Sequence, residues 1–260
     1  MKQNTLVAAF TLTLSLLLSA CASKNDAQAQ VESNQLNDGN EVYDPLEPIN
    51  RISWDIQYDF LDPYFIKPVA IGYRDYMPNF LRSGLLNMAN NLDEPSALIN
   101  NLLQAKGTDA AVSGGRFLIN STLGLLGLID VASHLGLEEK HEEFGEVLGT
   151  WGVSTGPYLM LVGPSDTRDT TGDLVDSAYF PLAALSWPAN LLRWSVKSVE
   201  GRIRLLDQEQ LLEDSSDPYI FVRESYFQRV RYEIYDGNVP QPKISEKEED
   251  DFEAFLNDLE

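Results

Sequence analysis

The sequence has 260 residues, with 19 Lys and Arg against 40 Asp and Glu, which gives a formal net charge of -21. A surface this acidic excludes nucleic acid as a partner, because nucleic-acid binding requires Lys and Arg that neutralise phosphates. It also gains nothing from anionic lipid headgroups, so any close contact with a membrane must be apolar. Cys21 is the only cysteine, and a disulfide within the chain is therefore excluded.

The start of the chain has the layout of an export signal. Lys2 is followed by an uncharged, mainly apolar run from 6 to 18, shorter than the roughly 20 apolar residues that span a bilayer. Leu-Ser-Ala-Cys at 18–21 resembles the lipobox of bacterial lipoproteins. We expect cleavage before Cys21 and a lipid anchor on its thiol; the alternative is an ordinary signal peptide with an incidental cysteine. Ala22, in place of Asp, favours the outer membrane by the same resemblance.

Composition divides the rest of the chain into three parts. Residues 21–42 are small and polar, which predicts a flexible lipidated tether with a random-coil reach of roughly 25 Å. Residues 43–237 are richer in apolar side chains, and their length suits one domain. Residues 238–260 form an acidic tail. The predicted organisation is therefore a signal peptide at 1–20, then the tether, the domain and the tail.

Apolar residues recur at helical spacing through most of the domain, which predicts a mainly α fold with each stripe facing the core. Pro78 and Pro95 are placed to begin two helices, Gly107 to end the second, and Asp217 with Pro218 to begin the last. Only residues 158–162, bracketed by Gly-Pro pairs, are strand-like. The stripes expected in the core are Leu81, Leu85, Met88 and Leu92; Leu98, Ile99, Leu102 and Leu103; Leu192, Val196, Val199, Ile203 and Leu206; and Tyr219, Val222 and Tyr226.

Two segments carry more apolar surface than a small helical domain needs. Residues 117–137 mix Leu and Ile with Gly and polar residues, so they are too broken to span a bilayer but suited to a membrane interface. Residues 180–194 place Trp at helical spacing, and Trp prefers the headgroup level of a membrane. An ordinary buried hairpin explains either segment equally well. The residues expected to face a membrane are Leu123, Leu125, Leu126 and Leu128, with Trp187, Leu191 and Trp194.

A hydrolase must be considered, because Gly152-Val153-Ser154-Thr155-Gly156 matches the nucleophile elbow of lipases and esterases. That elbow needs a strand before its serine and a catalytic histidine after it. Here the strand-like run follows Ser154, and both His134 and His141 precede it. We therefore expect no catalytic residues and no enzyme.

A metal site was also considered at His134, Glu138, His141 and Glu142, which would share one face of a continuous helix. Gly136 argues against that continuity, and no Glu follows a His in the order of the zinc metalloprotease motif. Surface solvation or packing explains these side chains better. No metal and no cofactor is expected.

Short motifs follow one another from about residue 44 to residue 229. They are DPLEPINR at 44–51, LDPY at 61–64, KPVA at 67–70, NLDEP at 91–95, RFLINS at 116–121, GLIDVA at 127–132, WGV at 151–153, GPY at 156–158, GPS at 163–165 and SDPY at 216–219. This ordered series resembles the MlaA (VacJ) family of outer-membrane lipoproteins and covers essentially the whole domain. The chain departs from the family at Ala105 and Leu126, where Gly is common.

The resemblance implies a single helical domain shaped as a ring, with a central amphipathic channel, seated in the inner leaflet of the outer membrane and often beside a trimeric porin. It implies that the protein withdraws phospholipids misplaced in the outer leaflet. It further implies that these lipids pass to a soluble periplasmic carrier for return to the inner membrane, which maintains lipid asymmetry. The family site is a channel and has no catalytic centre.

The residues independently suit such a path for lipid. A phospholipid that leaves a bilayer needs its headgroup solvated while its tails stay shielded from water. Polar side chains dispersed among Leu and Gly meet both needs, and the candidates to line the channel are Asn120, Ser121, Thr122 and Asp130. The alternative from another class is a structural lipoprotein that docks on a porin without moving lipid.

The tail lies outside the resemblance. Residues 243–260 contain eight acidic and two basic side chains, and an apolar stripe recurs among them at i, i+3, i+4 and i+7. Such a short acidic helix is unfolded alone, because nucleation is unfavourable and like charges repel. It could fold against an apolar groove of a periplasmic partner such as the lipid carrier; the alternative is a solvated terminus. The docking residues would be Phe252, Phe255, Leu256 and Leu259.

Overall fold

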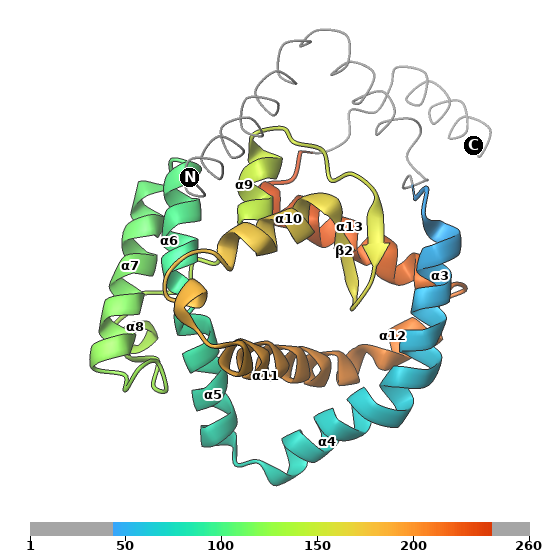
Figure 1. The fold of residues 1–260 in the computed structure, drawn as a ribbon, viewed down its shortest axis with the longest axis horizontal. Helices are drawn as coiled ribbons and strands as arrows, with labels where there is room; N and C mark the ends of the chain where they lie inside the picture. Colours follow the sequence, from blue (N-terminus) through green and yellow to red (C-terminus); the bar gives the residue numbers. More distant parts are fainter. Residues whose placement is uncertain (1–43, 241–260) are drawn as a thin grey trace, which may run out of the picture. The chain divides into compact units, whose positions relative to one another are not determined.

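The structure is a computed structural model that describes residues 44–240. The chain divides into two units, Met1–Asp44 and Pro45–Glu260, and the fold lies in the second. Cys21, the tether and the apolar stripe of the tail lie outside the described residues. The helices and strands, labelled as in Figure 1, are α3 (Glu47–Asp55), η2 (Ile56–Ile66), α4 (Lys67–Tyr76), α5 (Asn79–Asn91), α6 (Glu94–Leu103), α7 (Gly107–Thr122), α8 (Val131–His134), α9 (Phe144–Thr150), β1 (Tyr158–Met160), β2 (Pro164–Asp166), α10 (Thr167–Asp176), η3 (Leu182–Ala184), α11 (Trp187–Leu205), η4 (Leu206–Gln208), α12 (Glu209–Glu213) and α13 (Pro218–Ile234).

The expected mainly α architecture is confirmed, and within the second unit the helices surround a ring that α11 crosses (Figure 1). α3, η2 and α4 run on without a break as a curved arc, drawn in blue to cyan. The middle of this arc, η2, is a π-helix that contains Pro63, whose missing N–H interrupts regular α-helical hydrogen bonding. Among the described residues, none of the helices combines the length and hydropathy needed to cross a bilayer.

The expected helix starts are confirmed, but the expected end at Gly107 is wrong. α6 ends at Leu103, and Gly107 instead begins α7. The chain reverses at Ala105, which has a positive φ of 62°. Ala105 N–H donates to Leu102 O at 3.0 Å, and Lys106 N–H donates to Asn101 O at 2.9 Å. These two bonds are the Schellman pattern, in which the left-handed residue after the helix is usually glycine.

We expect Ala105→Gly to raise the free energy of unfolding by about 0.5–1 kcal/mol, because glycine adopts a positive φ without the clash of a Cβ. Ala105 is exposed, so no packing is lost. The matched control is Ala111→Gly, at an exposed position inside α7, which we expect to cost about 1 kcal/mol. Denaturant unfolding of both variants measures the difference; changes of the same sign would contradict the assignment of the left-handed residue.

The strand-like run is confirmed as a strand, β1, and its partner β2 was not expected from sequence. The two strands are antiparallel, with Tyr158 opposite Asp166. Asn50 of α3 extends this small sheet, because its Nδ2 donates to Tyr158 O at 3.0 Å and its Oδ1 accepts from Met160 N–H at 3.0 Å. The first motif of the domain thereby fixes a segment more than a hundred residues away.

The main apolar core lies where β1 meets α13. Its buried members are Tyr158, Met160, Tyr219, Tyr226 and Val230, with Trp54 of α3 packed against them. The ring of Tyr158 contacts those of Tyr219 and Tyr226 at centroid distances of 6.2 and 5.7 Å. Burial of Tyr219 and Tyr226 confirms the expectation for the last helix.

The other stripes face a core only in part. Val196 is buried as expected, but the expectation is wrong for Leu81, Leu102, Leu103 and Leu192, all of which are exposed. α6 shows the reason, because this helix turns its polar face inward. Asn100 Nδ2 donates to Glu142 O at 3.0 Å and to Asp176 Oδ1 at 2.8 Å, while Leu102 is 57% exposed. Among the described residues, the buried polar or charged side chains outnumber the buried apolar ones.

Candidate functional site

The candidate channel residues lie together at the turn between α7 and α8. Asn120, near the end of α7, is buried; its Nδ2 donates to Asp130 Oδ1 at 2.9 Å, and its Oδ1 accepts from Ala132 N–H at 2.9 Å. Asp130 caps α8 by accepting from Ser133 N–H at 3.1 Å. Burial acts to raise the pKa of Asp130, but hydrogen bonds from Ser133 and Asn120 outweigh it and hold that pKa below its ordinary value.

Ser121 and Thr122 bond to protein groups as well. Ser121 Oγ accepts from Asn91 Nδ2 at 2.9 Å, and Thr122 Oγ1 donates to Leu118 O at 2.7 Å. The four residues predicted from sequence are therefore neighbours that hold the turn in shape. Their contact with lipid stays a prediction.

Beneath this turn lies a buried ion pair between Arg116 of α7 and Glu94 of α6. Arg116 also donates to Ser133 Oγ at 2.8 Å, to Leu137 O at 2.7 Å and to Asp130 Oδ2 at 3.3 Å. Burial raises the pKa of Glu94 to about 7, against the opposing effect of Arg116. One guanidinium thus connects both ends of the turn to α6.

The turn displays leucine outward. Leu125 and Leu126 are 63% and 70% exposed, and Leu123 is exposed as well, whereas Leu128 is half-buried. Leu125 and Leu126 have positive φ values of 52° and 61°. The glycines beside them allow this shape, because a Cβ on Gly124 would lie 2.1 Å from Ile129 O and one on Gly127 would lie 2.6 Å from Asn91 Cβ. The backbone closes tightly and leaves the apolar side chains outside.

The start of α11 is a second exposed apolar surface. Trp187 is 76% exposed, and Leu191 and Trp194 are each 52% exposed. These three residues, like the leucines of the turn, are therefore not part of a buried hairpin. Their contact with a membrane stays a prediction.

The opposite, polar side of α11 is bound to the helices around it. Arg193 and Lys197 both bind Asp93, with the lysine at 2.7 Å. Arg82 of α5 donates two hydrogen bonds to Glu200, at 2.9 and 2.8 Å. α11 is therefore amphipathic. Its paired charged side chains face the neighbouring helices, and its Trp and Leu side chains are exposed.

A further apolar surface was missed by the sequence analysis. It follows the arc of α3, η2 and α4. A signal was present, because the segment 60–66 combines Phe, Leu, Tyr and Ile around a single proline. The exposed large apolar side chains of this arc are Ile49, Ile52, Ile56, Phe60, Leu61, Tyr64, Phe65, Ile66, Val69 and Tyr76.

The nucleophile-elbow match forms no such elbow. Ser154 lies in a loop, and its Oγ accepts a hydrogen bond from Gly156 N–H at 3.2 Å. The strand β1 follows Ser154 rather than preceding it. This geometry gives the serine no activation as a nucleophile.

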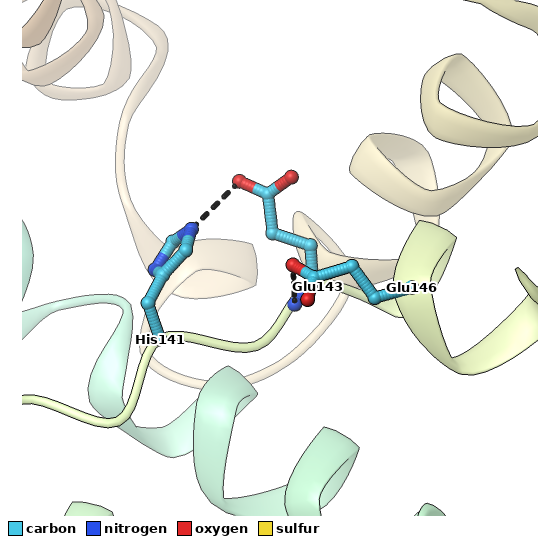
Figure 2. Close-up of side chains that lie close together, drawn as sticks. All are labelled: His141, Glu143 and Glu146. Atoms are coloured by element: carbon cyan, nitrogen blue, oxygen red, sulfur yellow. Dashed lines mark hydrogen bonds and ion pairs between the residues drawn. The ribbon is translucent and has the colours of Figure 1, made fainter. Parts of the chain in front are cut away.

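The histidines and glutamates considered for a metal are separated by the fold, except around His141. His134 ends α8 and bonds Asp130 O through Nδ1 at 2.8 Å. His141 instead lies beside Glu143 and Glu146 at the start of α9 (Figure 2). The hydrogen bond between His141 and Glu143 raises the pKa of His141 to about 9 and lowers that of Glu143 to about 2.

Comparison with known proteins places the chain. Residues 42–233 match the family model described as MlaA lipoprotein. The chain is 38% identical over 259 residues to the intermembrane phospholipid transport system lipoprotein MlaA of Escherichia coli K12, covering 97% of this chain and 96% of the relative. It is 36% identical over 252 residues to the protein of the same name from Haemophilus influenzae, covering 94% and 96%.

A solved structure is also similar. It comes from work on the structural basis for maintenance of bacterial outer membrane lipid asymmetry, with a TM-score of 0.71 and 40% sequence identity. The match covers 74% of this chain and 100% of the chain in the solved structure. The chain therefore belongs to the MlaA lipoprotein family.

Proposed function

We propose that this protein is an outer-membrane lipoprotein that removes phospholipids misplaced in the outer leaflet and passes them to a periplasmic carrier for return to the inner membrane. Its action maintains the lipid asymmetry of the outer membrane. The observation that carries this proposal is the distribution of side chains, because many large apolar side chains are exposed while many polar ones are buried. Apolar surface left in water costs roughly 25 cal/mol per Å² of area, and acyl chains remove that cost.

Three exposed apolar surfaces support a seat within one leaflet. They are the arc of α3, η2 and α4, the turn between α7 and α8, and the start of α11. Because the acidic chain gains nothing from anionic headgroups, these surfaces supply the membrane contact. Trp187 and Trp194 suit the headgroup level, where the ring is shielded and the indole N–H is solvated.

The path for lipid is assigned to the polar residues of the α7–α8 turn, Asn120, Ser121, Thr122 and Asp130. Support comes from their position next to the exposed leucines, which brings polar and apolar groups together within one turn. A headgroup would exchange its water for these donors and acceptors while its tails follow the leucines. The channel is a conduit in this proposal, and no bond of the lipid is broken.

The anchor is assigned to Cys21, on the periplasmic face of the outer membrane. We expect Cys21→Ala to leave the precursor uncleaved by the lipoprotein peptidase and to abolish complementation, because the apolar surfaces would then lack an acyl anchor. Gel mobility, fractionation and outer-leaflet lipid content measure this. Normal localisation and function of the variant would show that the lipobox assignment is wrong.

Two protein partners complete the proposal, a trimeric porin in the membrane and the soluble lipid carrier. We expect the tail to dock on the carrier through Phe252, Phe255, Leu256 and Leu259, so that deletion of residues 243–260 slows transfer of lipid to it. Phe252→Ser with Phe255→Ser tests the stripe separately from the charge. Transfer at the unmodified rate in both variants would leave the tail as a charged terminus only.

The function as a whole is tested by deleting the gene and measuring phospholipid in the outer leaflet. Accumulation that the intact chain reverses is expected. Native mass spectrometry of a gently solubilised preparation gives a second measurement, and co-purified phospholipid is expected. Absence of both, together with a tight porin complex, would favour the structural scaffold and overturn lipid transport.

A further inference from the structure

One side-chain cluster has no part in the proposed transport of lipid. His141, Glu143 and Glu146 each offer one ligand atom, and these atoms lie within 4.8 Å of one another (Figure 2). His141 Nε2 is 3.1 Å from Glu143 Oε1. The carboxylate of Glu146 points from the first turn of α9 toward the other two side chains. Three donors thus converge from a stretch of six residues.

Glu146 supplies a second observation, because its carboxyl group is buried and forms no ion pair with a described residue. The residue is only 8% exposed, and within residues 44–240 it takes part in no ion pair. One oxygen accepts from Glu143 N–H at 3.1 Å; the other has no hydrogen bond to a described residue. A buried carboxylate that lacks an ion pair is costly, and a bound cation is one way to remove the cost.

The nearby cations are already engaged. Lys106 binds Glu142 at 2.5 Å, Lys197 binds Asp93 at 2.7 Å, and Arg229 binds Glu233 at 3.1 Å. None of these three side chains is therefore available to neutralise Glu146. Among the described residues, His141 is the cation of this cluster, against the two carboxyl groups of Glu143 and Glu146.

We propose that His141, Glu143 and Glu146 bind a first-row divalent metal ion, with Zn²⁺ as the best match. Imidazole nitrogen and carboxylate oxygen both bind zinc, at bond lengths of roughly 2.0–2.2 Å, and three protein ligands leave a fourth position to water. Such a tetrahedral site separates its ligand atoms by roughly 3.4 Å, from the same bond lengths. Because the three ligand atoms lie within 4.8 Å of one another, no pair has to close by more than about 1.4 Å to reach that value. Mg²⁺ and Ca²⁺ fit less well, since they require more oxygen ligands and disfavour imidazole.

The first experiment measures Zn²⁺ binding to the full mature chain in detergent, prepared without a polyhistidine tag. Excess Mg²⁺ occupies weak sites among the many surface carboxylates. We expect one equivalent of Zn²⁺ by calorimetry and by elemental analysis after gel filtration. His141→Gln and Glu146→Gln should each weaken binding by at least about tenfold, because each removes a ligand. His134→Gln is the matched control, since the chain has only two histidines and His134 lies in another turn.

Glu146→Gln also separates binding from folding. Glutamine keeps the hydrogen bond to the Glu143 N–H that closes the capping box of α9, while it removes the charge. Zn²⁺ should raise the melting temperature of the unmodified chain and leave that of the variant unchanged. Binding of less than one equivalent, equal affinity in the three variants, or a loss with His134→Gln as large as with His141→Gln would overturn the metal site. None of these measurements depends on lipid transport.

Discussion

Replacing Arg116 by Met is expected to lower the free energy of unfolding by about 3–5 kcal/mol, the usual cost of breaking a buried ion pair from one side. The guanidinium is almost fully buried and binds Glu94, Ser133, Asp130 and the Leu137 carbonyl. Methionine fills much of the same volume but offers no donor. The variant therefore leaves the buried carboxyl of Glu94 without its ion pair and the Leu137 carbonyl without this donor.

Arg74→Met is the matched control, because Arg74 pairs with its neighbour Asp75 at the surface. An exposed pair contributes little, and we expect a change of less than about 0.5 kcal/mol. Denaturant unfolding followed by circular dichroism measures both variants under the same conditions. A loss of similar size in the two proteins would show that the Arg116 network adds no stability beyond that of a surface pair.

The free energy of unfolding that the Arg116→Met variant loses should also depend on pH. The pKa of Glu94 is raised from 4.5 to about 7 in the folded protein, so folding takes up a proton and stability falls as pH rises between those values. Above about pH 7 Glu94 in the unmodified chain releases this proton, and the stability of the folded protein no longer falls through this group as pH rises. Without Arg116, Glu94 keeps its proton to higher pH, and the variant continues to lose about 1.4 kcal/mol per pH unit. The difference between the two proteins should therefore widen above pH 7 and stay constant below it.

The sequence predicted the elements whose signals are local. Pro78 and Pro95 begin helices, Asp217 caps α13 through Ile220 N–H at 3.2 Å, and the Gly-Pro pairs enclose β1. Each of these signals acts within a few residues, so no knowledge of the rest of the fold is needed. The motif residue Asn50 was noticed as well, but its pairing with β1 could not be foreseen, because it joins segments far apart in the chain.

Apolar stripes at helical spacing predicted the wrong buried side for parts of α6 and α11, because these helices bury polar side chains and expose apolar ones. An apolar stripe normally faces inward in water, and that assumption placed Leu102 and Leu192 in the core. In this fold α6 and α11 direct Asn and ion pairs inward, and the leucines are left outside. The spacing of apolar residues along a helix shows which side chains share a face. It does not show which face is buried.

The candidate site was predicted only where its residues are close together in the sequence. Asn120 and Asp130 are close in sequence, so one turn brings them together at 2.9 Å. The cluster of His141, Glu143 and Glu146 was not predicted, because His141 was weighed only with His134, Glu138 and Glu142 on a continuous helix, and that arrangement was rejected at Gly136. α8 ends at His134, and residues 138–143 form no helix, so a different pair of glutamates lies beside His141.

Leu125→Asp is expected to reduce removal of outer-leaflet phospholipid by about tenfold or more while the free energy of unfolding changes by less than about 0.5 kcal/mol. Leu125 is 63% exposed, so its side chain adds little to the core. Its φ of 52° lies in the left-handed region, where Asp is better tolerated than Leu. The folded protein therefore accepts the change, whereas an acyl environment does not accept a carboxylate.

The matched control is Leu125→Asn. Asparagine has nearly the same shape as aspartate and tolerates the same backbone conformation, but it carries no charge. Because an amide costs less than a carboxylate at the level of acyl chains, the asparagine variant should retain more activity than the aspartate variant. Complementation, outer-leaflet lipid content and unfolding curves are compared for the three proteins. If aspartate lowers stability and activity together, or if both variants remain fully active, the turn between α7 and α8 does not contact the acyl chains, and its exposed leucines need another partner.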